Sequence, residues 1–257
     1  MGILNVTPDS FYASSRTLTE KSIIEKAEQM LIEGAKILDI GAFSTRPGAI
    51  DISTKDEISR LSGVVKTINA KFPNAIISVD TFRAQVAEVV LNEGAHIIND
   101  ITAGDGDTNM ADVIVKYKAT YIIMHMQGTP TTMIKNTNYN NLLTDVIDFF
   151  QQKIIILRKK GINDIIIDPG FGFSKTLDQN YEIVKKLDYF NVLNYPMLVG
   201  FSRKSMIYKY LDCEPEQALN GTTVLNTLAL QKGARILRVH DVKEAMETVA
   251  IYRKAEN

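Results

Sequence analysis

Cysteine, tryptophan and histidine are scarce in this chain of 257 residues, which has one cysteine, no tryptophan and three histidines. The lone Cys213 excludes a disulfide framework and is typical of a reducing compartment. Three histidines, with no H-x-H pair after the first strand, argue against a metal-dependent hydrolase barrel. The chain has neither an apolar run of about 18 residues nor a basic and apolar leader, so we expect a cytoplasmic protein.

A large net charge of either sign is also missing. The 29 basic and 30 acidic residues give a formal net charge of −1 at pH 7. So balanced a charge does not favour nucleic acid or an anionic membrane as a partner, and any basic patch must be local. Hydrophobic residues make up 45% of the chain, which is ordinary for a globular domain with a substantial core.

Short apolar stretches rich in β-branched residues alternate with helical patterns, and no low-complexity tract or linker marks a domain boundary. We predict strands at residues 2–6, 35–41, 75–80, 95–100, 119–125, 164–170, 196–202 and 234–241. Helical patterns lie between them, for example at residues 20–34, 56–72, 82–94 and 142–161. Eight such repeats in roughly 250 residues predict a single (β/α)8 TIM barrel over residues 1–257.

An open, doubly wound sheet is the structural alternative. It usually has five or six strands and a glycine-rich turn after the first one, whereas this first strand runs into Asn5-Val6-Thr7-Pro8. Helices cover both faces of the strands in a barrel, which explains strands that are apolar throughout. Because the first strand begins at about residue 2, we expect no amino-terminal hairpin to cap the barrel.

Local signals predict where several helices begin and end. Thr17 with Glu20, and Thr54 with Glu57, have the spacing of a capping box. Four glycines occupy the position expected just after a helix, namely Gly34, Gly94, Gly161 and Gly233.

Each predicted strand ends in a hydrogen-bonding side chain, and TIM barrels place their active sites at those ends. These residues are Asn5, Asp39, Asp80, Asn99, Asp100, His125, Asp168, Ser202, Arg238 and His240. A single residue of this kind is more often a helix cap or a turn former. Their convergence on one rim indicates a functional site, from which we leave Asp39 and Asp100 as structural residues.

The carboxylates of Asp80 and Asp168, with the Asn99 amide, suit a flat heterocycle rich in N–H donors, because a carboxylate accepts two parallel N–H bonds. Cationic side chains that suit a phosphorylated anion are Arg46, Lys204, Arg238 and His240. The side chains that could enclose a planar ring are Met124, Met126, Phe171 and Phe173, although each alone is more often part of the core.

Two other enzyme classes find little support in the residues. A Schiff-base aldolase needs a desolvated lysine inside the barrel, whereas Lys204 lies in a loop beside Arg203 and suits charge contact better. No arrangement typical of a Ser–His–Asp nucleophile is visible in the sequence.

Taken in order, the strand-end motifs resemble those of the dihydropteroate synthase family of pterin-binding enzymes. They are GILNVTPDSF (2–11), FSTRPGA (43–49), SVDTF (78–82), IND (98–100), MHMQGTP (124–130), DPGFGFSK (168–175), GFSRKS (200–205) and ILRVHD (236–241). The resemblance implies a transferase of folate biosynthesis that uses Mg²⁺ and joins 6-hydroxymethyl-7,8-dihydropterin diphosphate to 4-aminobenzoate. It also implies that sulfonamides, which mimic 4-aminobenzoate, compete for the site.

The resemblance further implies a role for each matching residue. The pterin would contact Asp80, Asn99, Met124, Asp168, Phe173 and Lys204. The diphosphate would contact Asn5, Thr45, Arg238 and His240, with Asn5 also close to the Mg²⁺ ion. The 4-aminobenzoate would contact Thr45, Arg46, Pro47, Phe171 and Ser202. The residues expected to act in catalysis are Arg46, Asp80, Lys204, Arg238 and His240.

Two features depart from the family. Its first loop commonly continues as a Ser-Asp-Gly-Gly-like turn, whereas this chain has YASSR at residues 12–16. The family usually has an amino-terminal hairpin before the first strand, which we do not expect in the sequence given. Members are commonly homodimers, for which residues 214–232 and 241–254 are the expected contacts. Two other activities remain open: a corrinoid-linked methyltetrahydrofolate methyltransferase, which would not need STRPG or GFSRKS, and a pterin-binding protein without catalysis.

Overall fold

The computed structural model describes residues 1–6, 16–42, 52–129 and 131–256. Within these ranges the strands are β1 (Gly2–Asn5), β2 (Ile37–Gly41), β3 (Ile76–Asp80), β4 (Ile97–Asp100), β5 (Thr120–Met124), β6 (Ile165–Asp168), β7 (Leu198–Val199) and β8 (Ile236–Leu237). The helices are α1 (Arg16–Ile32), α2 (Thr54–Lys71), α3 (Ala84–Asn92), α4 (Met110–Tyr117), α5 (Leu142–Lys159), α6 (Leu177–Lys185), α7 (Ser205–Tyr208), α8 (Leu219–Gln231) and α9 (Val242–Glu256). The described residues also form three short 3-10 helices, η2 (Met133–Lys135), η3 (Leu187–Leu193) and η4 (Pro215–Gln217).

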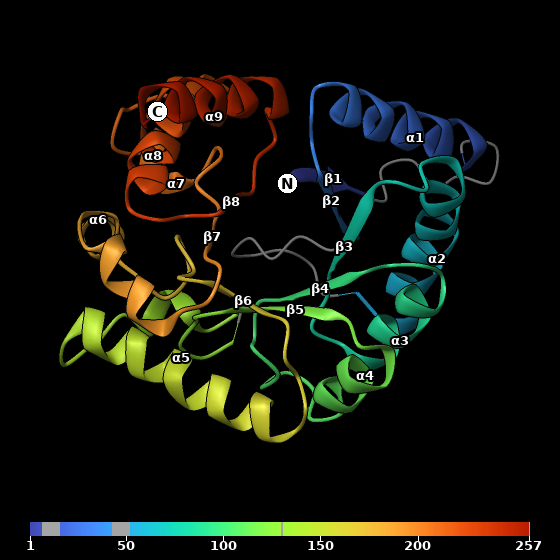
Figure 1. Cartoon of the computed structure of the whole chain (residues 1–257), viewed down its shortest axis with the longest axis horizontal. Helices are drawn as coiled ribbons and strands as arrows, with labels where there is room; N and C mark the ends of the chain where they lie inside the picture. The colour runs from blue at the N-terminus through green and yellow to red at the C-terminus, as the bar shows by residue number, and fades with distance from the viewer. Residues whose placement is uncertain (7–15, 43–51, 130, 257) are drawn as a thin grey trace.

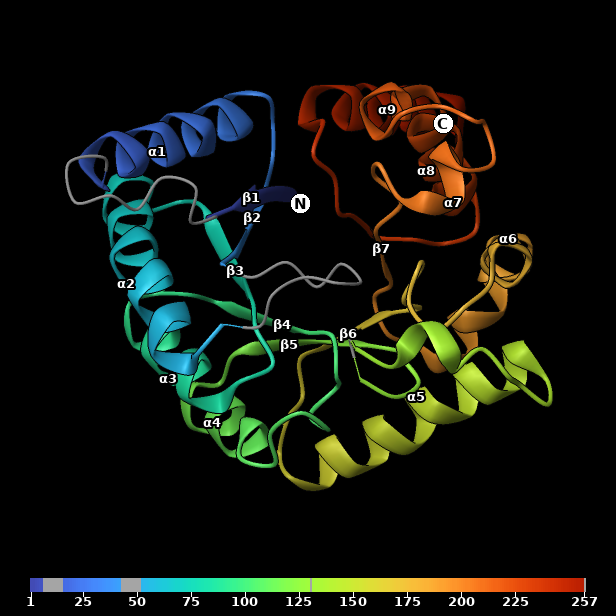
Figure 2. The same ribbon diagram turned by 180° about the vertical axis from the view of Figure 1, so that it is seen from behind.

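The strands form a closed parallel barrel surrounded by helices (Figures 1 and 2). Strands β1 to β6 pair in sequence order, and β7 pairs with β8. Two backbone bridges, Gly2 with Val239 and Ile167 with Met197, join these two sheets into a ring. The Ile3 amide donates to the Val239 carbonyl at 2.8 Å across one of these joints. The structure therefore confirms the predicted TIM barrel.

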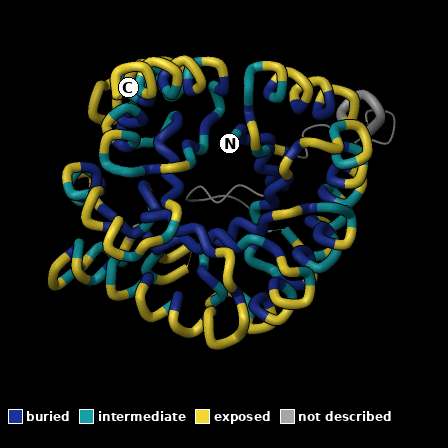
Figure 3. The backbone as a smooth tube through the Cα atoms, viewed as in Figure 1, coloured by how far each residue is buried: buried dark blue, intermediate teal, exposed yellow. Residues whose placement is uncertain are grey.

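Side chains alternate along each strand between the barrel interior and the surrounding helices. A small interior cluster contains Ile97, Ile122, Ile166 and Leu198, and a much larger cluster fills the space between strands and helices. Figure 3 shows the strands buried and the outer sides of the helices exposed. Asn99 lies two residues after Ile97 and Asp168 two residues after Ile166, so each has the same inward face as the apolar residue before it. The interior therefore changes from apolar to polar toward the carboxyl ends of the strands.

The predicted strand and helix boundaries need correction at several places. Strands β7 and β8 have two residues each, far shorter than predicted. The predicted cap at Thr54 is wrong by one residue, because Ser53 caps α2 and its hydroxyl accepts from the Asp56 amide at 3.1 Å. Thr17 lies inside α1, which begins at Arg16, so it does not occupy a cap position.

The four predicted helix-ending glycines are confirmed. They have φ angles between +97° and +106° at Gly34, Gly94, Gly161 and Gly233. This left-handed region favours glycine, and each glycine turns the chain from a helix into the next stretch of the barrel.

Candidate active site

A polar network lies inside the barrel where β2, β3, β4 and β8 end. Arg238 donates from Nε to Asp39 Oδ2 at 2.6 Å and from Nη2 to Asp80 Oδ2 at 3.1 Å. The Asn99 Nδ2 group donates to Asp39 Oδ2 at 3.3 Å, and the Ser78 hydroxyl donates to Asp39 Oδ1 at 2.6 Å. A guanidinium between two carboxylates offsets the unfavourable desolvation of all three charges.

Asp80 is the member of this network with the most perturbed carboxyl group. Only 13% of its side chain is exposed. Burial raises the pKa of Asp80 to about 7, the positive charge of Arg238 opposes that rise, and the negative charge of Asp39 adds to it. The Asp80 carboxyl can therefore gain or lose a proton near neutral pH, which is common for groups in functional sites.

Asp168 and Lys204 form a second part of the rim, where β6 ends and α7 begins. Asp168 is 6% exposed, and its Oδ1 accepts from the Gly170 amide at 2.8 Å. Burial raises the pKa of Asp168, and Lys204 is the strongest opposing influence. Lys204 Nζ donates to the Phe171 carbonyl at 2.6 Å and lies 5.1 Å from the centroid of the Phe173 ring. Burial lowers the pKa of Lys204 to about 8, against the effect of Asp168.

Lys175 and Gly170 fix the shape of the loop that follows β6. The buried Lys175 Nζ lies 3.0 Å from His125 Nδ1 and donates to the carbonyls of Gly170 and Phe173 at 3.1 and 3.2 Å. Burial lowers the pKa of His125 to about 2 and that of Lys175 to about 7, so the imidazole is neutral. Gly170 has a φ of +73°, and a β-carbon there would lie 2.1 Å from the His125 carbonyl oxygen.

Ser202 and His240 are paired where β7 and β8 lead into the rim. The His240 amide donates to Ser202 Oγ at 3.1 Å, and Oγ lies 2.9 Å from His240 Nδ1. When the hydroxyl donates to Nδ1, a neutral imidazole carries its proton on Nε2. The serine therefore orients the ring.

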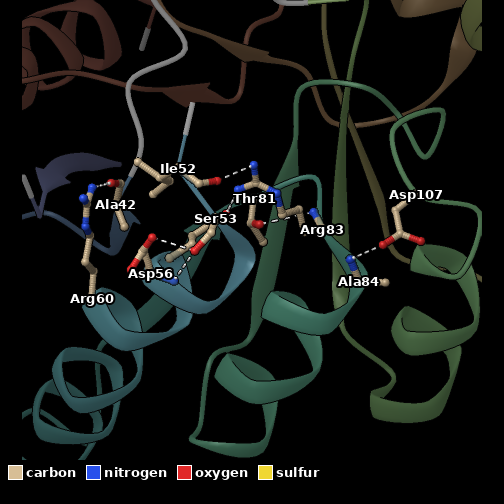
Figure 4. A network of polar contacts seen from close by, with 10 residues as sticks. Ala42, Ile52, Ser53, Asp56, Arg60, Thr81, Arg83, Ala84 and Asp107 are labelled. Atoms are coloured by element: carbon tan, nitrogen blue, oxygen red, sulfur yellow. Dashed lines mark hydrogen bonds and ion pairs between the residues drawn. The ribbon is translucent and has the colours of Figure 1, made fainter. Parts of the chain in front are cut away.

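Two arginines hold the chain at either side of residues 43–51. Arg60 donates to the Ala42 carbonyl at 3.1 Å, and Arg83 Nη2 donates to the Ile52 carbonyl at 2.9 Å (Figure 4). Arg83 also forms an ion pair with the buried Glu57. Both junctions of this segment with the barrel are thus fixed near the end of β3.

The sequence and the fold both match known proteins. The profile of a family described as pterin binding enzyme matches residues 1–240. A dihydropteroate synthase of Haemophilus influenzae is 40% identical, with 100% of this chain and 94% of the relative covered. The chain belongs to the pterin-binding enzyme family.

Solved structures of this family superpose on the whole barrel. The Yersinia pestis dihydropteroate synthase in complex with a sulfonamide drug has a TM-score of 0.93 and 39% identity, and the match covers 100% of this chain and 93% of that one. The Xanthomonas albilineans dihydropteroate synthase with 4-aminobenzoic acid has a TM-score of 0.91 and 33% identity, with 100% and 92% covered.

Several residues predicted from the family resemblance come together in the structure. Asp80 and Asn99 are adjacent in the β3–β4 register, and Met124 lies beside Asp168 in the β5–β6 register. Met124 is 2% exposed and packs directly under the rim. The Arg238 guanidinium contacts the carboxylates of Asp39 and Asp80, a pairing that the sequence did not predict.

Other predicted residues lie elsewhere. Thr45, Arg46 and Pro47 fall outside the described residues. The Phe171 ring is fully buried and lies 4.4 Å from the Phe201 ring, centroid to centroid. The predicted contact of the Phe171 ring with 4-aminobenzoate is therefore not supported, and it is the Phe171 carbonyl that takes part in the site.

The expectation that all strand-end polar residues converge on one rim is wrong for two of them. Asp100 points toward the helices and accepts from the Tyr121 hydroxyl at 2.5 Å, so its structural assignment is confirmed. His125 packs edge-on against Phe149, with the centroids 5.0 Å apart. Asp100 follows the inward-facing Asn99, and His125 follows the inward-facing Met124. Because side chains alternate along a strand, Asp100 and His125 both face outward.

Sequence reasoning missed two buried residues that shape the family site. Asp39 was left as structural, yet it contacts Arg238 and Asn99 directly. Lys175 was not singled out, although it joins the loops that follow β5 and β6. The alternation signal pointed to Asp39, because it has the same parity on β2 as the interior residue Ile37.

Asn5 is exposed at the end of β1, on the rim. Across the described ranges, no cluster of three or more His, Cys, Asp or Glu residues could hold a metal ion by itself. Mg²⁺ commonly takes one or two protein oxygens and completes its shell with water and substrate phosphates. The Asn5 amide oxygen therefore fits an ion carried mainly by a diphosphate.

A pocket of about 580 Å³ opens at the opposite mouth of the barrel. Residues such as Lys36, Ile37, Leu237 and Tyr252 line it, and none of the strand-end polar groups does. The polar rim is therefore the better candidate for chemistry. No helix in the described part of the chain has the length and apolar character needed to cross a membrane.

Proposed function

We propose that this protein has dihydropteroate synthase activity, joining 6-hydroxymethyl-7,8-dihydropterin diphosphate to 4-aminobenzoate and releasing pyrophosphate. The observation that carries this proposal is a rim of buried carboxylates, an amide and a lysine in a chain that matches dihydropteroate synthases over its full length. Donor-rich heterocycles need acceptors of this kind, and an anionic tail needs nearby cations.

The pterin edge is proposed to bind Asp168, Asn99 and Asp80. Asp168 retains acceptor capacity beyond its bond to the Gly170 amide, because each carboxylate oxygen has two lone pairs. Lys204, close to Asp168 and above the Phe173 ring, supplies a donor for a ring carbonyl or nitrogen. Acceptors and a donor on one rim match the alternating polarity of a pterin edge.

Arg238 and His240 are proposed to bind the diphosphate, together with Asn5 and Thr45. Asp39 and Asp80 engage two N–H groups of Arg238, and a guanidinium has five. The others are therefore proposed to serve the leaving group. His240 is oriented by Ser202 and, when protonated, adds positive charge.

The 4-aminobenzoate is proposed to bind between Ser202 and the segment that carries Thr45, Arg46 and Pro47. Arg46 would pair with the carboxylate of this substrate. The anchoring of Ala42 and Ile52 by Arg60 and Arg83 supports this placement, because it holds both junctions of the segment at the rim.

Mg²⁺ is proposed as the metal, held by Asn5 and the substrate. When bound, it would neutralise negative charge on the diphosphate. The fit of the exposed Asn5 amide to a single oxygen ligand supports this assignment.

The reaction is proposed to be a dissociative displacement. The bond between the pterin methylene carbon and the diphosphate oxygen breaks first, and its electron pair leaves with pyrophosphate. The dihydropterin ring delocalises the cation, which the amine nitrogen of 4-aminobenzoate then attacks before losing a proton. Asp80, whose pKa is near 7, stabilises the positive charge that develops on the ring when its carboxyl is ionised. Positioning and electrostatics supply most of the acceleration.

Pyrophosphate release tests the proposed activity. Incubation with the pterin diphosphate, Mg²⁺ and 4-aminobenzoate is expected to release pyrophosphate and form dihydropteroate, and a sulfonamide is expected to inhibit the reaction competitively against 4-aminobenzoate. Absence of aminobenzoate-dependent release from folded protein would instead favour methyl transfer or pterin binding alone.

A homodimer is proposed on the basis of exposed apolar side chains on the late helices. These are Val224 and Leu228 on α8 and Met246 and Ile251 on α9. Val224→Glu is expected to give monomers in sedimentation velocity, whereas the control Ile32→Glu, at a still more exposed residue of α1, is expected to stay dimeric. Monomeric wild-type protein would refute the dimer. The lone Cys213 supports a cytoplasmic location.

A further inference from the structure

Asp39 lies below the rim and is completely buried. Its Oδ2 accepts from Arg238 Nε at 2.6 Å and from Asn99 Nδ2 at 3.3 Å, while its Oδ1 accepts from the Ser78 hydroxyl at 2.6 Å. These donors come from three other parts of the barrel, next to β8, on β4 and on β3. An ionised carboxylate with several donors is a stable way to keep a charge inside a protein.

The carboxylate dictates how the Asn99 amide is turned. An ionised carboxylate has no proton to donate, so only the NH2 group of Asn99 makes a favourable contact with Asp39. The Asn99 oxygen is consequently directed away from Asp39. The residue two positions before Asn99 on this face, Ile97, belongs to the apolar interior, so the open side is the rim. Asp39 thereby makes Asn99 an acceptor toward the ligand.

The same carboxylate fixes the Arg238 guanidinium. Asp39 holds Nε, which lies near the base of the planar group, and Asp80 holds Nη2. Two contacts on different nitrogens define the plane of the guanidinium, because its N–H groups form a rigid fork. With Asp39 removed, Arg238 would retain only Asp80 as a carboxylate partner among these contacts and could rotate toward it.

We propose that Asp39 is a positioning residue for pterin recognition, setting the orientation of the Asn99 amide and the plane of the Arg238 guanidinium without touching the ligand. This inference rests on the proposed pterin site. It revises the sequence-based assignment of Asp39 as a structural residue. One buried carboxylate would then set the orientation of both the Asn99 amide and the Arg238 guanidinium.

Asp39→Asn tests the inference, since asparagine keeps the size of the side chain and removes its charge. By analogy with supporting groups that orient metal ligands, we expect the Kd for 6-hydroxymethylpterin to rise about 10- to 100-fold. The KM for the pterin diphosphate should rise with it, while the KM for 4-aminobenzoate changes little. A variant that binds the pterin like the wild type would overturn the proposal.

The pH profile of pterin binding provides a readout that general destabilisation does not produce. The charged groups that act on Asp80 are Arg238, Asp39, Glu57 and Asp100, and Asp80 in turn acts on Lys204. Asp39 raises the pKa of Asp80, so its neutralisation should move the acidic limb of pterin binding to lower pH. An unchanged acidic limb would count against the proposal.

Asp100→Asn is the matched control, because Asp100 is an equally buried carboxylate on β4 that faces the helices. We expect it to lower stability and leave pterin affinity nearly unchanged. An affinity loss as large as that of Asp39→Asn would overturn the proposal by showing a general effect of a lost buried charge. Asp100 also acts on Asp80, more weakly than Asp39, so a smaller pH shift is expected.

Neutron diffraction of the wild-type protein with 6-hydroxymethylpterin needs no variant. Deuterium on the Asn99 nitrogen that faces Asp39 would support the inference, and an Asn99 oxygen facing Asp39 would overturn it. Failure of the wild type to bind the pterin would instead reject the proposed function, which separates the two hypotheses.

Discussion

Replacing Asp168 by asparagine tests the acceptor role of the rim, because the two side chains have the same shape and differ in charge and in one hydrogen-bonding group. Asp168 Oδ1 accepts from the Gly170 amide at 2.8 Å. In the variant the asparagine oxygen should keep this bond. Its NH2 group would then face the ligand, so that a donor meets the N–H donors of the pterin.

The expected loss follows from the burial of the group. Asp168 is 6% exposed, so bulk water does little to replace a lost partner. Breaking a buried charged hydrogen-bonding pair costs about 3–5 kcal/mol. At about 1.4 kcal/mol per tenfold change, the Kd for 6-hydroxymethylpterin should rise on the order of 10²- to 10³-fold.

Isothermal titration calorimetry at neutral pH measures this loss, and Asp164→Asn, an exposed residue just before the same strand, is the control. Burial raises the pKa of Asp168 above its unfolded value, so the ionised carboxyl weakens the folded state increasingly as pH rises through that range. A neutral asparagine avoids this effect, and the Tm of the ligand-free variant should not fall. Pterin binding within threefold of the wild type would refute the acceptor role.

Four further outcomes are expected. Pterin affinity should fall as pH rises through about 8, where Lys204 loses its proton, and constant affinity in calorimetry across this range would contradict this. Because the folded pKa of Lys204 lies below its unfolded value of 10.5, the protein without pterin should gain stability from about pH 8 toward 10.5, which thermal melts would measure. Arg46→Ala should raise the KM for 4-aminobenzoate and spare pterin binding, and steady-state kinetics with the reverse pattern would reject its assignment. Gly170→Ala should lower the free energy of unfolding by a few kcal/mol in urea titrations, because its β-carbon would lie 2.1 Å from the His125 carbonyl. Gly63→Ala, on an exposed helical face with nothing within 4 Å, should instead stabilise the protein by about 0.5–1 kcal/mol.

The sequence alone was sufficient for the barrel and for most of its rim. Apolar strands between helical patterns leave few architectures open, and glycines such as Gly94 and Gly161 mark helix ends through a conformational need that is local. Asp80, Asn99 and Asp168 were found because parallel strands in a barrel bring their carboxyl ends together whatever the details of packing.

Strand lengths at β7 and β8 could not be predicted in the same way. The stretches around Val199 and Leu237 are apolar beyond the paired residues, but past these pairs Ser202 and His240 contact each other through their side chains and Arg238 contacts the interior carboxylates. Which backbone groups pair depends on those contacts between distant segments, and local propensity carries no information about them.

The fold, the positions of the polar strand ends and the acceptor-rich chemistry of the rim follow from the residue pattern alone. Three contacts became visible only in the folded barrel: Asp39 joins Arg238 to Asn99, Lys175 contacts His125 under the loop after β6, and the Phe171 ring is buried while its carbonyl accepts from Lys204. They could not be read from the sequence because an alternating strand pattern fixes the face on which a side chain lies, whereas its partners depend on the register and distance of other strands.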